Sequence, residues 1–395
     1  MTARVLVTGV GLISPLGHSA RGYWESLLYR ESLPQEHPTL PPALLPNQRY
    51  YGIADDEPAE ETARAESRAT RLAVKATGMA LDDAGLIPAD LSRTTVGVCF
   101  GTGMGESDRL EISHTEAALR GDAPSSFFLS RIAARLAETY GFTGANTTLS
   151  TACSAGSYAM ALAHERIVSG EAEVMVAGGS EIYSRVGQGC FHRLGALDPV
   201  ACRPFDVDRK GTVFGEGVAA LILESEEHAR RRGRRRVLAQ FEGAGWSCDG
   251  YHTTAPEPTG RWIEAAMLRA LSAAGVTPQD IDCVLPHGTG TSLNDLVESQ
   301  ALARVFGDRV RDLKVSAIKG KLGHSGGSAG AVACATAAMI LERGVVPPTG
   351  NVNVVDAECG LPIRVDAPTP ASIRHVLVNA YAFGGNNISV VLGRG

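Results

Sequence analysis

Residues 148–168, TLSTACSAGSYAMALAHERIV, hold a short strand-like segment, a turn of small residues and an alanine-rich helical stretch. Residues 313–342, LKVSAIKGKLGHSGGSAGAVACATAAMILE, repeat this order, with His324 at the turn where the first copy has Cys153. A weaker echo relates VGVCFGTG at 96–103 to CVLPHGTG at 283–290. These similarities predict a duplicated fold. Two similar halves that face each other would bring the cysteine and the histidine into one cleft.

Apolar strand candidates alternate with helical stretches along the rest of the chain, which predicts an α/β fold with mixed or parallel sheets. The apolar runs are continuous, as expected of strands that are buried on both faces. We expect strands at 4–9, 96–101, 174–178, 217–223, 282–286, 376–380 and 388–392. Helices are expected at 20–29, 64–84, 127–139, 154–168, 262–274, 295–305 and 327–342. Residues 32–62 are rich in Pro, Glu and Asp and lack periodicity, so they are expected to form an exposed excursion.

The bulk composition excludes several classes of protein. The chain has 395 residues, is 44% hydrophobic and 20% charged, and carries a net charge of −6, which gives no reason to expect nucleic acid binding. No apolar stretch reaches the roughly 18 residues needed to span a bilayer, and the N-terminal sequence has no convincing signal-peptide cleavage site, so we expect no membrane association and a cytoplasmic location. None of the eight cysteines belongs to a CxxC pair, which argues against a metal site or a redox dithiol.

Cys153 lies at a predicted strand-to-helix junction. The unpaired N–H groups at a helix start favour the thiolate, which is the reactive form of cysteine. The small neighbours Ala152, Ser154, Ala155 and Gly156 would let a substrate approach closely. A buried cysteine that simply packs at the start of a helix is the other interpretation, and this motif alone does not decide between them.

Histidines mark two further turns. His287 lies in PHGTGTSLNDLVESQ (286–300), where Asp295 and Glu298 follow at helical spacing and share a helix face. His324 lies in SAIKGKLGHSGGSAGAVA (316–333), in a turn whose glycines permit unusual backbone angles and close ligand contact. Each histidine could instead be structural, and the carboxylates a solvated face. Lys319 is either a surface charge or, if buried near Glu298, part of an ion pair that shapes a site.

The last motif is NAYAFGGNNISVVLG at 379–393. Its turn, Phe383 to Gly385, follows a predicted strand and could aim a backbone N–H into a cleft. An ordinary hairpin before the final strand would give the same pattern.

Taken together, these motifs resemble the elongating β-ketoacyl-acyl-carrier-protein synthases and type II polyketide ketosynthases of the thiolase superfamily. The matching segments are TACSAG, RPFDVDRKGTVFGEG (203–217), DGYHTTAPEP (249–258), HGTGTSLND, KGKLGH and AFGGNN, and they span nearly the whole chain. The resemblance implies a thiolase-like duplicated fold, layered αβαβα, with two central mixed sheets. It places the half that carries the nucleophile at 1–245 and the half that carries both histidines at 246–395.

The resemblance also implies a reaction. Cys153 would take an acyl chain from an acyl carrier protein, and His287 and His324 would hold the thioester oxygen of a malonyl-carrier protein while it decarboxylates. The resulting carbanion would attack the acyl-cysteine. The backbone N–H groups of Cys153 and Phe383 would form an oxyanion hole, and Phe383 would act as a gate.

Further roles are carried over position by position. The resemblance assigns site support to Lys319, Glu298 and Asp295, and phosphopantetheine or substrate contacts to Thr289, Thr291, Thr254 and Phe191. Met104 would limit the acyl pocket near a dimer interface. Arg64 and Arg68 could attract the acidic carrier protein. No metal and no permanently bound cofactor are implied, because substrates arrive on phosphopantetheine, and the chain would form a homodimer or pair with a subunit of the chain-length-factor kind.

This sequence departs from the common family pattern at several motifs. TACSAG replaces TACTSG, AYAFGGNN replaces FGFGGTN, GHSGGSAG replaces a bulkier GHxxGAAG, and GESDR at 105–109 places charges where small or apolar residues are usual. These differences concern acyl specificity more than the reaction. They favour a specialised polyketide or polyene pathway over housekeeping fatty acid synthesis.

Three other functions are alternatives for this sequence. A non-catalytic chain-length-factor subunit would lack the nucleophile, whereas this chain keeps Cys153, His287 and His324. A degradative thiolase would use a second cysteine near the C-terminus, and no cysteine follows Cys359. A starter-unit synthase typically has asparagine in place of the second histidine.

Overall fold

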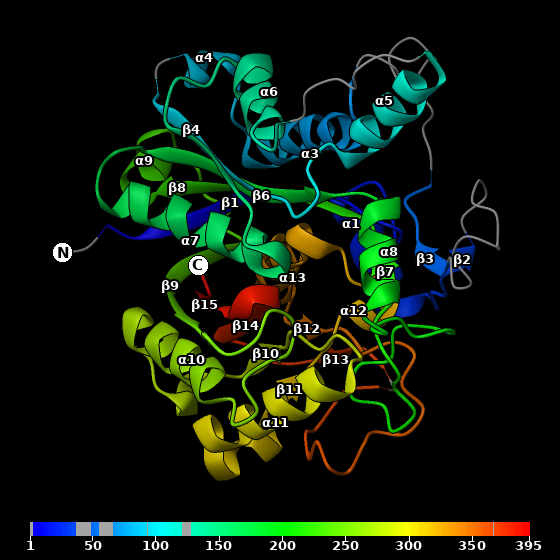
Figure 1. The fold of residues 1–395 in the computed structure, drawn as a ribbon. Helices are drawn as coiled ribbons and strands as arrows, with labels where there is room; N and C mark the ends of the chain where they lie inside the picture. The colour runs from blue at the N-terminus through cyan, green and yellow to red at the C-terminus, as the bar shows by residue number, and fades with distance from the viewer. Residues whose placement is uncertain (1–2, 37–48, 55–65, 93, 121–127, 366) are drawn as a thin grey trace.

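The computed structural model describes residues 3–36, 49–54, 66–92, 94–120, 128–365 and 367–395 (Figure 1). Ten strands form the main sheet, in the order β11-β10-β14-β15-β9-β1-β8-β6-β4-β5. They are β1 (Val5–Ile13), β4 (Val96–Gly101), β5 (Asn146–Leu149), β6 (Val174–Glu181), β8 (Gly217–Ser225), β9 (Ala239–Cys248), β10 (Cys283–Leu285), β11 (Lys314–Val315), β14 (His375–Ala382) and β15 (Asn386–Gly393).

The helices that surround and separate these strands run from a short N-terminal helix to the long alanine-rich one. They are α1 (Ala20–Tyr29), α3 (Arg68–Ala84), α4 (Pro88–Leu91), α5 (Ser107–Arg120), α6 (Arg131–Tyr140), α7 (Ala155–Val168), α8 (Arg185–Arg193), α9 (Glu226–Arg231), α10 (Arg261–Ala274), α11 (Ser292–Phe306), α12 (Lys319–Leu322) and α13 (Ala329–Arg343). No helix in the described part of the chain combines the length and the apolar character that a bilayer span requires.

The main sheet consists of two halves with one topology. The order β5-β4-β6-β8-β1 in the first half matches β11-β10-β14-β15-β9 in the second, and equivalent neighbours have the same relative direction. The echo between 96–103 and 283–290 is explained, because β4 and β10 are equivalent strands. The prediction of a duplicated fold with two mixed sheets is therefore confirmed.

The two half-sheets are joined edge to edge, which the sequence did not predict. β1 pairs antiparallel with β9 through Val5–Phe241, Leu6–Gln240 and Val7–Ala239. The expected division of the chain at 245/246 falls inside β9, and the second topological half begins at Ala239 instead. The glycines of AQFEGAGWSC conceal this strand, because they break its otherwise alternating apolar pattern.

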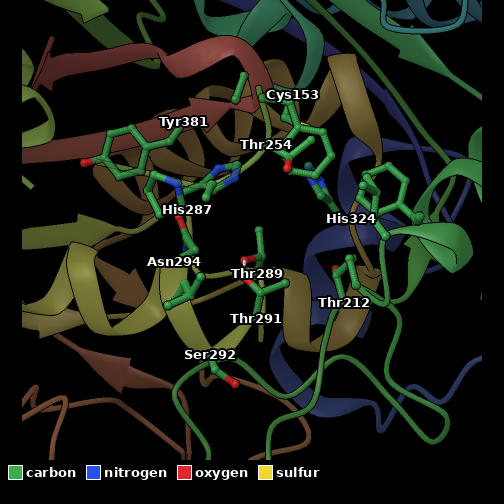
Figure 2. Close-up of a pocket in the computed structure, with 18 of the residues that line it drawn as sticks. Cys153, Thr212, Thr254, His287, Thr289, Thr291, Ser292, Asn294, His324 and Tyr381 are labelled. Atoms are coloured by element: carbon green, nitrogen blue, oxygen red, sulfur yellow. Dashed lines mark hydrogen bonds between the residues drawn. The ribbon is translucent and has the colours of Figure 1, made fainter. Parts of the chain in front are cut away.

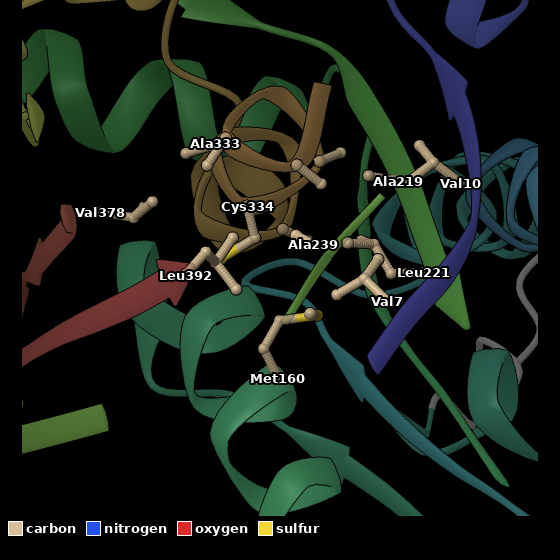
Figure 3. Close-up of a cluster of buried hydrophobic side chains, with 14 of the residues drawn as sticks. Val7, Val10, Met160, Ala219, Leu221, Ala239, Ala333, Cys334, Val378 and Leu392 are labelled. Carbon is tan, nitrogen blue, oxygen red and sulfur yellow. The ribbon is translucent and has the colours of Figure 1, made fainter. Parts of the chain in front are cut away.

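Five layers follow from this arrangement (Figure 1). One apolar cluster packs α3 and α6 on the outer face of the first half-sheet, and another packs α10 and α11 on the outer face of the second. The largest cluster lies between the half-sheets around α7 and α13, with Met160, Cys334 and Val7 among its members (Figure 3). Every residue of α13 from Ala329 to Leu341 is buried, as expected of a helix that is apolar all round.

The two central helices cross in close contact at glycines. A Cβ on Gly156 of α7 would lie 2.7 Å from the amide nitrogen of Ala331, and a Cβ on Gly330 of α13 would lie 2.2 Å from the Ser157 hydroxyl. Both glycines belong to the first turn of their helix. The crossing therefore holds together the N-terminal ends of the two helices, where the Cys153 and His324 turns lie.

The small strands of the described excursion lie beside the second of these turns. β2 (Gln35–Glu36) pairs with β3 (Arg49–Tyr51), which pairs with β7 (Phe214–Gly215), and Phe214 bridges to His324. A further pair, β12 (Val345–Val346) and β13 (Thr369–Pro370), stands apart from the main sheet. The remainder of the predicted excursion, at 37–48 and 55–62, lies outside the described residues.

Candidate active site

Cys153 sits on a sharp turn between β5 and α7. Ala152 has a positive φ of 47°, which is unusual for a residue with a Cβ, and a single 3₁₀ turn at Ala152–Ser154 leads directly into α7. Backbone strain of this kind persists only where the surrounding structure imposes it. The turn presents the Cys153 sulfur at the start of the helix, where only 7% of the residue is exposed.

Two backbone amides converge on this sulfur. The backbone N–H groups of Cys153 and Phe383 both act on the Cys153 thiol and lower its pKa. Phe383 begins a turn after β14 in which Gly384 has φ 81°. This turn aims an amide from the second half of the chain at the nucleophile of the first, which is the geometry predicted for an oxyanion hole.

His287 and His324 lie together next to the cysteine. Their ring centroids are 5.4 Å apart with the planes nearly perpendicular, at 86°. Both residues are buried, and both line the same cavity as Cys153 (Figure 2). Neither Nδ1 atom has a hydrogen-bond partner among the described residues.

Burial decides the protonation state of both imidazoles. It lowers the pKa of His287 and of His324 well below 6.5, and the nearby Lys319 charge lowers both further. Both rings are therefore neutral at physiological pH. A neutral imidazole offers one N–H donor and one acceptor nitrogen, so each ring can stabilise a developing oxyanion or accept a proton.

Three charged side chains hydrogen-bond the backbone of the His287 turn. Glu298 accepts hydrogen bonds from the amides of His287, at 2.8 Å, and Gly288, at 2.9 Å, while the Lys319 ammonium donates to the His287 carbonyl oxygen. Asp295 accepts from the Thr289 amide at 3.0 Å. Glu298 and Asp295 do share a helix face, as predicted. Lys319 is buried and is not a surface charge, and it is linked to Glu298 through the His287 backbone, because Lys319 binds the carbonyl oxygen of His287 and Glu298 binds its amide.

The helix-start position of Cys153 favours the thiolate, but burial of the sulfur opposes this effect. Burial raises the pKa of the Cys153 thiol to about 11, and this outweighs the lowering by the Lys319 charge and by the two amides. The resting nucleophile is therefore a thiol that must lose its proton during attack. The neighbouring neutral imidazoles are the groups able to accept that proton.

The cavity in front of the sulfur has a volume of about 310 Å³. Figure 2 shows Thr289, Thr291 and Ser292 in succession below the two imidazoles, leading away from Cys153. Thr254 and Phe191 line the same cavity, and the Phe191 ring stacks on Phe383 with centroids 5.5 Å apart.

The remaining predicted site residues lie elsewhere. Met104 does not line the cavity, and its amide donates to Glu181. Arg68 binds Glu216 at 2.6 Å and the Ile53 carbonyl oxygen at 2.9 Å, so its guanidinium is engaged within the protein rather than displayed to a carrier protein. Arg64 lies outside the described residues.

Sequence reasoning missed several groups at the site. Tyr381 packs against His287 with ring centroids 5.6 Å apart, and Asn387 reaches the cavity wall and donates to Asp249 at 2.6 Å. Tyr381 and Asn387 flank the AFGG turn, and Asp249 opens DGYHTTAPEP, so the motifs pointed to the right segments but not to these side chains. No feature of the sequence had singled out Glu181 or Lys210.

The protonation state of the two imidazoles can be measured directly. We expect the nitrogen resonances of His287 and His324 to remain those of neutral rings from neutral pH down to about pH 6, because burial disfavours the cation. NMR of the histidine-labelled protein would show this, with His287→Ala and His324→Ala spectra for assignment. A titration midpoint near 6.5 for either ring would contradict the burial argument.

Comparison with known proteins agrees with the geometry. The model of the β-ketoacyl synthase N-terminal domain matches residues 2–229, and that of the C-terminal domain matches 238–353. Nodulation protein E of Rhizobium meliloti (strain 1021) is 33% identical over 98% of each chain. The 3-oxoacyl-[acyl-carrier-protein] synthase 2 of Mycobacterium bovis is 35% identical over 99% of this chain and 97% of its own.

Two solved structures cover the whole chain. A chain of the ishigamide ketosynthase/chain length factor superposes with a TM-score of 0.94 and 34% identity, over 100% of both chains. A chain of AntDE:AntF, a type II polyketide ketosynthase in complex with its acyl-carrier protein, gives a TM-score of 0.93 and 26% identity, also over 100% of both. On this evidence the chain belongs to the β-ketoacyl synthase family and is a ketosynthase, an acyltransferase that condenses acyl thioesters.

Proposed function

We propose that Cys153 carries the acyl chain, and that His287 and His324 act on a malonyl group delivered by an acyl carrier protein. The observation that supports these roles is the convergence of one sulfur, two amide donors and two neutral imidazoles on a single cavity. Each group then has one task in a two-step reaction that passes through a covalent thioester.

In the first step the sulfur attacks the carbonyl carbon of an acyl-pantetheine thioester. A new carbon–sulfur bond forms, the pantetheine sulfur leaves, and the proton of the Cys153 thiol ends on that leaving sulfur by way of an imidazole. The tetrahedral oxygen lies against the amides of Cys153 and Phe383. Preorganised donors of this kind stabilise the oxyanion without reorganisation.

In the second step malonyl-pantetheine loses carbon dioxide. The electrons of the broken bond move to the thioester oxygen, where the N–H groups of His287 and His324 stabilise the negative charge. The resulting carbanion attacks the acyl-Cys153 carbonyl carbon and expels the sulfur as a thiolate, which takes up one proton from solvent to restore the thiol. The product is a 3-oxoacyl chain, two carbons longer, on the carrier protein.

We also propose that the substrates reach Cys153 on phosphopantetheine, past the hydroxyls of Thr289, Thr291 and Thr254, and that the chain needs no permanent cofactor. The electrons of the new bond come from the carboxylate that is lost, so the reaction balances without an added oxidant or reductant. The cytoplasmic location expected from the sequence stays a prediction.

The reaction can be tested with purified components. Acyl-carrier protein and malonyl-carrier protein, incubated with the enzyme, are expected to yield the 3-oxoacyl-carrier protein and an equal amount of carbon dioxide. Varying the acyl chain by length and unsaturation defines the preferred substrate. Cleavage of 3-oxoacyl coenzyme A without use of malonyl groups would favour the degradative thiolase instead, although Cys359 lies outside the cavity lining.

For the pathway we propose type II polyketide or polyene synthesis, supported by the two structural neighbours described above. The charges of GESDR give this proposal no support. Glu106 is buried against Arg131 at 3.1 Å, and Asp108 accepts from the Ser67 hydroxyl at 2.6 Å. These side chains support α3 and do not line the cavity, so they do not set acyl specificity through direct contact.

We further propose that the chain works with a second subunit, either a copy of itself or a subunit of the chain-length-factor kind. Within the described residues the edge strand β5 pairs with β4 alone, which leaves a row of backbone groups suited to another strand. Phe128, 61% exposed, and Leu129 precede α6, which packs on β5. Two structural neighbours, the ishigamide ketosynthase/chain length factor and the ketosynthase ApeO in complex with its chain length factor ApeC, are assemblies of this kind.

Phe128→Arg is expected to weaken this association, because a charge would be buried against apolar surface. The chain would be prepared alone and co-expressed with a subunit of the chain-length-factor kind. Native mass spectrometry would then measure the fraction of the chain that is present as a dimer. Tyr29→Arg, at an aromatic residue that is 77% exposed on α1, is the matched control. A wild-type chain that is active but stays monomeric, both alone and when co-expressed, would contradict the proposal.

A further inference from the structure

Glu181, the last residue of β6, is the most unusual buried charge near the site. It is 0% exposed. One carboxylate oxygen accepts from the amides of Gly103, at 2.7 Å, and Gly327, at 2.8 Å, and the other accepts from the amide of Met104 at 2.9 Å. The donors come from two turns, one after β4 and one directly before α13. Among the described residues no cation lies within ion-pair distance of this carboxylate.

The two turns are in close contact around this carboxylate. A Cβ on Gly326 would lie 2.8 Å from a Glu181 oxygen, as would a Cβ on Gly103. A Cβ on Gly327 would lie only 2.3 Å from the Gly103 amide nitrogen. Packing this tight transmits a displacement of either turn to the other.

Each of the two turns lies next to a segment that carries a residue of the site. Gly327 lies three residues after His324, in the turn whose 3₁₀ segment, Gly326–Ser328, leads into α13. A Cβ on Gly187 of α8 would lie 3.8 Å from the end of the Met104 side chain, and α8 also carries Phe191 of the cavity wall. Glu181 therefore links the turn that lies against α8 to the turn that follows His324.

The charge of Glu181 also affects the pKa of the nucleophile, Cys153. Burial raises the pKa of Cys153, the Lys319 charge lowers it, and the Glu181 charge raises it. Burial raises the pKa of Glu181 itself to about 7, against the lowering effect of the amides and of the Thr102 hydroxyl. The ionisable groups around the sulfur are thus Lys319, Glu181 and the two histidines.

We propose that Glu181 is a positioning residue for the condensation step. It ties the Gly103–Met104 turn to the turn that carries His324, and so fixes the position of the imidazole that stabilises the enolate oxygen. This inference rests on the proposed function.

Two variants separate geometry from charge. Glu181→Gln removes the charge and places a side-chain NH2 group opposite backbone N–H groups, which it cannot bind. Glu181→Asp keeps the charge, but its side chain is one methylene shorter and the carboxylate lies farther from the two turns. With Cys153 already acylated, both are expected to lower the condensation rate about 10-fold or more, because small misplacements of a catalytic group are costly. Acylation of Cys153 is expected to stay within about threefold of wild type.

The effect of the Glu181 charge on the pKa of Cys153 can be measured separately, without a carrier protein. The pH profile of Cys153 alkylation by iodoacetamide is expected to shift to lower pH by about half a unit or more in Glu181→Gln, since a negative charge is removed, and to stay near wild type in Glu181→Asp. Glu224→Gln is the matched control, because Glu224 is equally buried in the adjoining strand β8 but binds Arg232 and His228.

Wild-type condensation by acylated enzyme in both variants would overturn the inference. So would an equal loss of both half-reactions with an unmoved alkylation profile, which indicates support of the fold alone. If Glu181→Gln does not fold, Glu181→Asp decides the geometric part by itself. A wild-type enzyme that alkylates normally but never condenses would instead refute the proposed function.

Discussion

Replacing Cys153 with alanine is expected to abolish condensation and leave the fold intact. The reaction has no other route, because the acyl chain must be held on this sulfur while the carbanion forms. We expect the rate of 3-oxoacyl product formation to fall by about 10⁴-fold or more. Loss of one buried sulfur should cost stability by about 1 kcal/mol, so the thermal unfolding curve should barely move. Product would be quantified by mass spectrometry of the carrier protein.

The appropriate control is Cys190→Ala. Cys190 is exposed on α8, and its thiol is free, as is that of Cys153. This variant should acylate and condense as the wild type does. Product formation by Cys153→Ala at the wild-type rate would refute the nucleophile assignment, and acylation of Cys190 in its place would show that an exposed thiol carries the chain.

His324→Ala is expected to separate the two half-reactions. The amides of Cys153 and Phe383 remain in place for the acyl transfer, so Cys153 should still be acylated. Decarboxylation loses one of two donors to the enolate oxygen, which should lower the condensation rate by about 10²–10³-fold, or about 2.7–4 kcal/mol. Separate assays of acyl-enzyme formation and of carbon dioxide release would measure the two steps.

His114→Ala provides the comparison for this experiment, because His114 is an exposed histidine on α5, far along the chain from either turn. Acylation and condensation should both be unchanged in it. If His324→Ala slows acylation and condensation by the same factor, the division of roles between the amides and the imidazoles is wrong.

Much of the fold was predictable because the duplication leaves a mark in the sequence. The turns at Cys153 and His324 precede helices that begin with small residues and are rich in alanine, and α1 was predicted with its observed bounds. Strand segments were expected at the start of 148–168 and of 313–342, but the bounds of β5 and β11 were not, because four and two residues are too few to establish a period. α5 and α8 were also missed, since SDRLEISHTEAALR and RVGQGCFHR are polar or glycine-bearing.

The site was predictable to the level of motifs. Cys153, His287, His324 and Phe383 are brought together as expected, since each lies in a segment with its own glycine-bearing or small-residue turn. The thiol state of Cys153 was not predictable, because the cost of burial depends on neighbours that only the fold supplies. The bridge from Lys319 through the His287 backbone to Glu298 likewise follows from the path of the main chain and not from residue types.

The most direct test of the account follows the mass of the peptide that contains Cys153 during one turnover. Incubation with acyl-carrier protein is expected to add one acyl group to Cys153, and malonyl-carrier protein should then remove it as an equal amount of carbon dioxide and 3-oxoacyl product appears. Product formed while Cys153 stays unmodified, or an acyl group that malonyl-carrier protein never removes, would contradict it.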